Sequence, residues 1–113
     1  MYYALRNKVQ LIGNVGQSPE VRLTEKGHKW ARFSLATNSV YRGSGGEKIT
    51  ETQWHNLVAW GKVAETIEKY VPSGKEIAIE GKLVHRSYVD KDGVKKYVTE
   101  VQVGEILLLG KNN

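Results

Sequence analysis

Residues 53–62 of this 113-residue chain read QWHNLVAWGK, and this stretch predicts a β-strand with two unlike faces. Side chains separated by an even number of residues point to the same side of a strand, so Trp54 and Trp60 share one face. The other face carries His55, Leu57 and Ala59, and its aliphatic side chains supply the contacts with an apolar core. Two large rings on the side away from the core need another cover. In a basic chain, the natural cover is a nucleobase.

The segments around this strand predict a small β-barrel. Alternating patterns predict strands, and apolar residues at helical spacing predict one helix that stops at Pro72. The predicted strands are residues 8–12, 28–37, 47–60, 77–88 and 97–103, with a further extended segment around 20–23 and a helix at 63–71. Three strands, one helix and two strands are the order of an OB-fold, so we expect an all-β, five-stranded Greek-key barrel with one α-helix between strands 3 and 4. An SH3-like barrel would lack the helix, and a ferredoxin-like fold would need a second one.

Two connections have clear turn chemistry. Gly43-Ser44-Gly45-Gly46 predicts a mobile loop between two strands, of the kind that often closes over ligands. Asp90-Lys91-Asp92-Gly93 predicts a hairpin turn between the last two strands.

Length and composition predict one globular domain over residues 1–113. Hydrophobic residues make up 40% of the chain and charged residues 26%, and no apolar stretch is long enough to cross a bilayer. The start of the chain lacks the pattern of a secretion signal, so we expect a cytoplasmic protein. The chain has no cysteine, and its three histidines lack metal-ligand spacing, so disulfides and thiolate metal sites are excluded and zinc is disfavoured. We expect no metal and no cofactor.

The basic balance of the chain favours a polyanionic partner, since its net charge is +5 and its pI is near 9.5. Four aromatic residues interleaved with basic ones are expected to stack on bases: Tyr41, Trp54, Trp60 and Tyr88. Flat rings stack on any base and contribute about 1–3 kcal/mol per base, while cations neutralise phosphates without reading sequence. The residues expected to bind phosphates are Lys8, Arg22, Arg32, Arg42, Lys48, Lys62 and Arg86. Such a surface prefers unpaired strands, because a duplex hides the faces of its bases.

Tryptophans also fill protein cores, and for a single Trp that is the preferred explanation. The two in residues 53–62 share a face opposite Leu57, and Tyr88 shares its face with Arg86, so all three are expected on the outside. Trp30 fits either explanation, because it shares a face with polar residues but could equally plug one end of the barrel.

The sequence resembles the bacterial and mitochondrial single-stranded DNA-binding protein family from about Arg6 to Gly110. The motifs that carry this resemblance follow the order and spacing of the family. They are NKV at 7–9, LIGNVG at 11–16, PEVR at 19–22, FSLAT at 33–37, TQWH at 52–55, GKVAE at 61–65, IEGKL at 79–83 and YVTEV at 97–101.

The resemblance implies that bases stack at the four aromatic positions given above. Tyr41 stands where many members have Trp, and Trp60 stands where many have Phe. Lys62 matches a basic contact of the family, as does Arg86, whereas Asn56 occupies a position that is often Arg. Family members usually assemble as homotetramers, and the residue corresponding to His55 lies at a subunit contact.

The expected function is therefore non-catalytic: sequence-independent binding and protection of single-stranded DNA in replication, recombination and repair, in the cytoplasm and associated with the nucleoid. Many bacterial members add a Gly/Pro-rich linker and an acidic tail that recruits other enzymes. This chain stops at Asn113 with basic and amide residues, so it does not support tail-mediated recruitment. The sequence leaves open whether this is a truncated form or a short member.

Three alternative functions fit the sequence less well. An RNA-binding or primosomal OB protein is disfavoured by the family motifs. A small nuclease or esterase would need a nucleophile, paired carboxylates or a metal site, and turn chemistry explains Asp90 and Asp92. A β-barrel subunit that binds only protein would leave the aromatic face unexplained.

Overall fold

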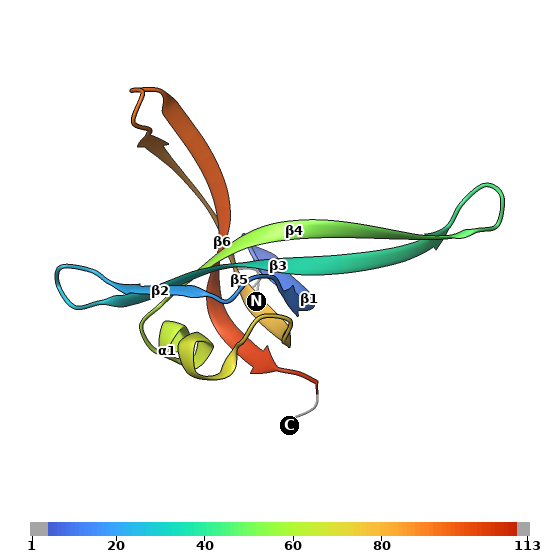
Figure 1. Ribbon diagram of the computed structural model, residues 1–113, viewed down its shortest axis with the longest axis horizontal. Helices are drawn as coiled ribbons and strands as arrows, with labels where there is room; N and C mark the ends of the chain where they lie inside the picture. Colours follow the sequence, from blue (N-terminus) through green and yellow to red (C-terminus); the bar gives the residue numbers. More distant parts are fainter. Residues whose placement is uncertain (1–4, 111–113) are drawn as a thin grey trace.

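The structure is a computed structural model that describes residues 5–110. Residues 1–4 and 111–113, at the ends of the predicted domain, lie outside the described part. Within it the chain forms six strands and one helix (Figure 1), in the order β1 (Val9–Val15), β2 (Glu20–Leu23), β3 (Lys29–Arg42), β4 (Lys48–Trp60), α1 (Gly61–Tyr70), β5 (Glu76–Val89) and β6 (Lys95–Leu108). No helix in residues 5–110 has the length and apolar character needed to cross a membrane.

Five of these strands close a barrel because β1 pairs along both of its edges. β1 is antiparallel to β5 over residues 9–14, and at Asn14 and Val15 it turns to pair with β3. β3 pairs with β4, β4 pairs in parallel with β6, and β6 pairs with β5, which closes the ring. Gly13 permits the close approach of β1 to β3, since a Cβ there would lie 2.1 Å from the backbone oxygen of Ala36.

The predicted OB-fold is confirmed by this arrangement. β2 is the extended segment predicted around residues 20–23, and it pairs only with the first residues of β3, outside the ring. Among the barrel strands, α1 therefore falls between the third, β4, and the fourth, β5. β3 and β6 run further than the sequence patterns indicate, to Arg42 and Leu108, whereas β4 is close to its predicted length.

The core lies inside the barrel and under α1. The strands contribute inward-facing side chains at alternate positions, and the helix closes one end of the barrel with its apolar side. The buried members of this cluster are Val15, Ala31, Phe33, Leu35, Leu57, Ala59, Ala64, Ile67, Val71, Ile77, Ile79, Val101 and Val103. The predicted inward face of β4, with Leu57 and Ala59, is thereby confirmed.

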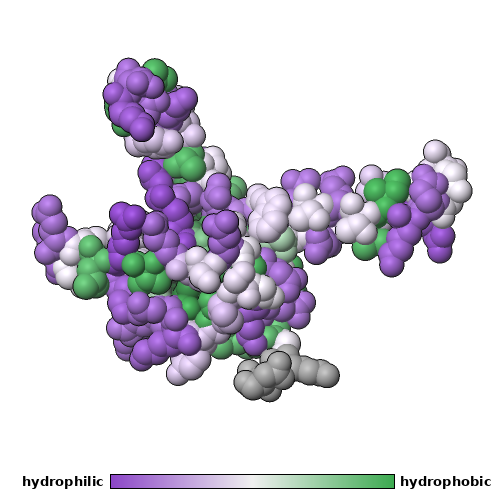
Figure 2. Space-filling view, viewed as in Figure 1, coloured by the Kyte–Doolittle hydropathy of each residue, from purple (hydrophilic) through white to green (hydrophobic). Residues whose placement is uncertain are grey.

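Two hairpins extend beyond the barrel as two-stranded ribbons, which we call the β3–β4 arm and the β5–β6 arm (Figure 1). They explain a radius of gyration of 16.3 Å, compared with about 13 Å for a compact domain of this length. The tip of the β5–β6 arm carries mostly hydrophilic side chains, with some exposed apolar surface among them (Figure 2), to which Val89 and Val94 contribute. The predicted glycine loop forms the tip of the β3–β4 arm, where the Gly43 and Gly46 amides donate hydrogen bonds to backbone oxygens; its mobility stays a prediction.

Candidate nucleic-acid interface

Strand register gathers the predicted stacking residues of β4 on one outward surface. Trp30 lies opposite Trp60 and Ala36 lies opposite Trp54 in the β3–β4 ladder. Directly paired residues point to the same side of a sheet, so these positions share one face. The same face continues across β6 and β5 through the pairs Val58 with Gln102, Val84 with Glu100, Arg86 with Val98 and Tyr88 with Lys96. We call it the aromatic face, defined by Trp30, Arg32, Trp54, Trp60, Arg86 and Tyr88.

The predicted exposure of its rings is confirmed. Trp54 is 61% exposed, Trp60 47% and Tyr88 49%, although each side chain is large and apolar. Trp54 lies over the backbone at Gly16, where an added Cβ would come within 2.9 Å of the indole ring. The glycine therefore leaves the space that the edge of that ring occupies. Each ring keeps an accessible surface on which a planar ligand can stack.

Tyr41 lies apart from the other three predicted stacking residues. It is half-exposed on the β3–β4 arm, where it pairs with Ile49. Alternation along the ribbon puts residues 41 and 49 on the side opposite Trp54. The structure therefore brings together two tryptophans and Tyr88 on the aromatic face, and places Tyr41 on the other side of the arm.

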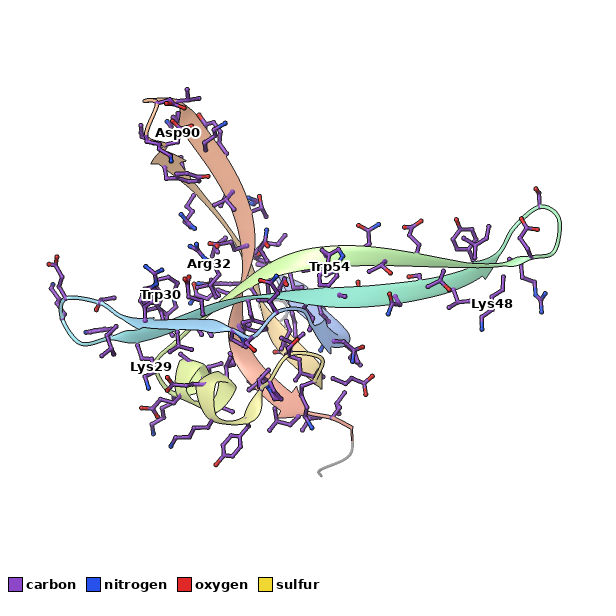
Figure 3. All side chains as sticks on the ribbon, viewed as in Figure 1. Lys29, Trp30, Arg32, Lys48, Trp54 and Asp90 are labelled. Carbon is purple, nitrogen blue, oxygen red and sulfur yellow. The ribbon has the colours of Figure 1, made fainter. Side chains whose placement is uncertain are left out.

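Trp30, whose place the sequence left open, lies on the aromatic face beside Trp60. The centroids of the two indoles are 6.4 Å apart and their planes are tilted by 40°. The guanidinium of Arg32 lies over the Trp30 ring, 5.4 Å from its centroid. Figure 3 shows Trp30 and Arg32 close together where β3 passes the base of the β5–β6 arm, with Trp54 further along β4. Trp30 is half-buried by these neighbours.

Glu100 is a functional candidate that sequence reasoning missed. It lies on β6 and is only 4% exposed. Its carboxylate accepts hydrogen bonds from Nε and Nη2 of Arg86, at 2.9 and 3.3 Å, and its Oε2 lies 3.6 Å from Nε of Arg32. The hydrogen bond to Glu100 raises the pKa of Arg86 above its usual value. The alternation of β6 indicates that Glu100 faces outward, but its two cationic partners come from β3 and β5.

These side chains border a groove of about 330 Å³ between the Trp60 side and the Arg86 side of the aromatic face. Val58 and Gln102, which pair directly across β4 and β6, also line it. Arg86 additionally lies 5.9 Å from the centroid of the Tyr88 ring. The groove thus combines aromatic surface with positive charge.

The other predicted phosphate ligands lie in three places. Arg22 and Lys62 lie near the Trp30–Trp60 pair. Arg22 is opposite Trp30 in the β2–β3 ladder, and its guanidinium forms an ion pair with Glu20 at 2.8 Å. Lys62 follows Trp60 in the chain, at the start of α1. Arg42 and Lys48 face each other at the tip of the β3–β4 arm (Figure 3 labels Lys48). Lys8 forms an ion pair with Glu80 at 3.3 Å, beside β1 and β5. Of the seven predicted phosphate ligands, only Arg32 and Arg86 border the groove.

His55 faces the inner side of β4 and already has a partner within the chain. Its Nε2 lies 2.9 Å from Oγ1 of Thr37, and the residue is half-buried. Its predicted role at a subunit contact stays a prediction. Among residues 5–110, no group of three or more histidine or carboxylate side chains is placed to hold a metal ion.

Comparison with known proteins agrees with this geometry. The sequence profile of the "Single-strand binding protein family" matches residues 6–109. The chain belongs to this family. It is 43% identical over 105 residues to "Single-stranded DNA-binding protein 1" of Chlorobaculum tepidum, covering 92% of this chain and 65% of that protein. It is 45% identical over 105 residues to "Single-stranded DNA-binding protein" of Bacteroides thetaiotaomicron, covering 91% and 65%.

A solved structure of the single-strand binding protein family has the same fold. "Plasmodium falciparum SSB complex with ssDNA" matches with a TM-score of 0.83 and 31% identity, covering 92% of this chain and 95% of that one. The chain spans about 65% of the length of the Chlorobaculum and Bacteroides relatives. The shared part is therefore the barrel with its arms.

Proposed function

We propose that this chain binds single-stranded DNA without sequence preference, as a non-catalytic protein that protects unpaired strands in replication, recombination and repair. The observation that carries the proposal is the aromatic face, where large rings are half-exposed beside guanidinium groups on the outside of a closed barrel. Two proteins similar by sequence are named for single-stranded DNA binding, and one similar solved structure is a complex with such DNA.

In the proposed mechanism, aromatic rings bind the bases and cationic side chains bind the phosphates. Bases stack on Trp54, Trp60 and Tyr88, and Tyr41 extends the track along the other side of the β3–β4 arm. The two tryptophans of β4 are six positions apart, about 20 Å along a strand. A polynucleotide must therefore span several nucleotides to reach both, which agrees with the site of about 4–16 nucleotides that single OB-folds cover. The basic residues neutralise the phosphates in between.

Binding rather than catalysis is the inference because Asp90, in the turn of the β5–β6 arm, and Glu100, at the groove, both have structural partners. Oδ1 of Asp90 accepts hydrogen bonds from the backbone amides of Asp92 and Val94, both at 2.9 Å, and so holds the turn of the β5–β6 arm. Glu100 binds two arginines. Oδ2 of Asp90 lies 4.0 Å from Nζ of Lys96, beyond hydrogen-bond distance, and the side-chain partners of Glu100 are arginines. Neither carboxylate is therefore hydrogen-bonded to a histidine or lysine as in a proton-transfer pair.

The proposal is tested by titrating intrinsic tryptophan fluorescence with oligo(dT) and with a duplex of equal length, each at two salt concentrations. We expect quenching by the unpaired strand, much weaker binding of the duplex, and a log affinity that falls with log salt by about 0.7 per phosphate bound. Equal affinity for both DNA forms at the same salt would refute the proposal.

We also propose that the protein assembles as a homotetramer in the cytoplasm, with β1 and its neighbours at one interface. Residues 9–13 of β1 pair only with β5, so their second edge has no strand partner among residues 5–110. Ile12 and Leu107, on β1 and β6, are 63% and 62% exposed beside a hollow lined by Leu11, Ile79 and Ile106. An open strand edge next to apolar surface suits a second copy of the same chain. His55 is proposed as a further contact.

Replacement of Ile12 by Glu is expected to lower the mass measured by light scattering from that of the tetramer to that of a smaller species. The reason is that a carboxylate would be buried against apolar surface without a partner. Val40→Glu, at another exposed apolar position on the β3–β4 arm, should leave the mass unchanged. An unchanged mass for the Ile12 variant, or a monomeric wild-type protein, would contradict the proposed interface.

A further inference from the structure

The groove between Trp60 and Arg86 contains a carboxylate and an amide, which base stacking on the four predicted rings does not explain. It measures about 330 Å³ and receives side chains from β3, β4, β5 and β6. That volume lies at the lower end of the range for small-ligand sites, about 300–1,000 Å³, and a single nucleotide fits it. Its polar groups are two guanidiniums, the carboxylate of Glu100 and the amide of Gln102.

Glu100 is the unexpected member, because a carboxylate on a surface for a polyanion repels phosphates. Here the carboxylate is buried and pairs with two guanidiniums, so its negative charge is compensated within the groove. The carboxylate uses two of the five N–H donors of Arg86 and leaves three for another acceptor. It lies 3.6 Å from Nε of Arg32, which is too long for a hydrogen bond, so the donors of Arg32 are also available. The three groups together carry one positive charge.

Trp30 connects this ionic group with the stacking surface. Its ring packs at a tilt against Trp60, 6.4 Å between centroids, and carries the guanidinium of Arg32 at 5.4 Å. A guanidinium over an indole face is held by cation–π attraction, which restricts the arginine to one region of the groove. Side chains fixed before binding lose less conformational entropy when the ligand arrives.

We propose that Glu100 and Trp30, to which the expected DNA contacts assign no role, are positioning residues of the single-stranded DNA site. They hold the guanidiniums of Arg32 and Arg86 in place beside Trp60, so that the groove forms a subsite for one nucleotide, its base against Trp60 and its phosphate on the two arginines. Gln102 offers an amide donor and acceptor to any base edge, so the subsite takes every base. This inference rests on the proposed function, since it assigns further residues to the same ligand.

Glu100→Gln provides the decisive test, because two explanations predict opposite results. If Glu100 positions the arginines, the variant binds oligo(dT) roughly tenfold more weakly at low salt, since it loses the charge of the hydrogen bonds to Arg86 and the ion pair with Arg32. The slope of log affinity against log salt then decreases by about 0.7 for each phosphate that the variant no longer binds. If Glu100 only repels DNA, the variant binds more tightly. Glu25→Gln, the same charge change at an exposed residue in the β2–β3 turn, is the control and should not weaken binding.

Circular dichroism and thermal unfolding show whether Glu100→Gln is less stable than the wild-type protein. If it is, binding measurements on two arginine variants and on a double variant provide the test. Arg32→Gln and Arg86→Gln, each alone, should decrease the salt slope by about 0.7. Arg32→Gln should also have a smaller effect when combined with Glu100→Gln, because groups in one network are not additive. Wild-type protein that fails to bind oligo(dT) refutes the proposed function itself. Wild-type binding that all three variants retain, with unchanged slopes, refutes the subsite alone.

Discussion

Replacing both Trp54 and Trp60 with alanine is expected to weaken oligo(dT) binding by about 30-fold or more. Each stacked base contributes about 1–3 kcal/mol, so the removal of two platforms costs at least about 2 kcal/mol. Both rings are outside the core, at 61% and 47% exposure, so their removal leaves the barrel folded. The measurement is a titration monitored by fluorescence anisotropy of a labelled oligonucleotide, because the variant lacks two of the three tryptophans.

The matched control for this experiment is Tyr70→Ala. Tyr70 is 59% exposed at the end of α1, away from the aromatic face, so its removal should leave affinity within about twofold. The salt slope of the double tryptophan variant should equal that of the wild type, since no charge has been removed. Trp30→Ala alone should cost less than the double change, because Arg32 already covers the Trp30 ring. Near-wild-type affinity of the double variant would show that bases stack elsewhere.

Replacing Leu57 with alanine is expected to lower the free energy of unfolding by about 2–5 kcal/mol. Leu57 is fully buried at the centre of β4, opposite Phe33 on β3 and Val101 on β6, so the cavity left behind is bordered by three barrel strands. The measurement is urea denaturation followed by circular dichroism at one fixed protein concentration, since assembly would make stability concentration-dependent.

Asn56→Ala is the internal comparison, because Asn56 is the neighbouring residue on the exposed side of the same strand. Its effect on unfolding should stay within about 0.5 kcal/mol, as for ordinary surface substitutions. Equal destabilisation by the two changes would contradict the assignment of inward and outward faces on β4.

The faces of β4 were predictable because alternation is local information. Trp54, Leu57 and Trp60 are close in sequence, so a period of two decides which side each one takes. The barrel followed from the order of elements, with the helix placed by its apolar spacing and by the proline and glycine after it. The same alternation, applied from Trp30 along β3, separates Tyr41 from the other rings, which grouping by residue type did not reveal.

The groove was not predictable, since it depends on register between distant strands. Trp30 meets Trp60 only because β3 and β4 pair at that offset, and Glu100 meets its arginines only after β3, β5 and β6 have closed the ring. A pairing shifted by one residue would turn each of these side chains to the opposite face. No pattern within one strand carries that information.

The two arms are expected to be more flexible than the closed barrel from which they extend. A ribbon of two strands has no packed interior of its own, so its outer hydrogen bonds open at a lower free energy than those of the closed ring. The platform that aligns the indoles can thus stay rigid while the extensions bend to follow a polymer whose path differs from one encounter to the next. Compliance of this kind suits a ligand without fixed shape better than a rigid cleft would.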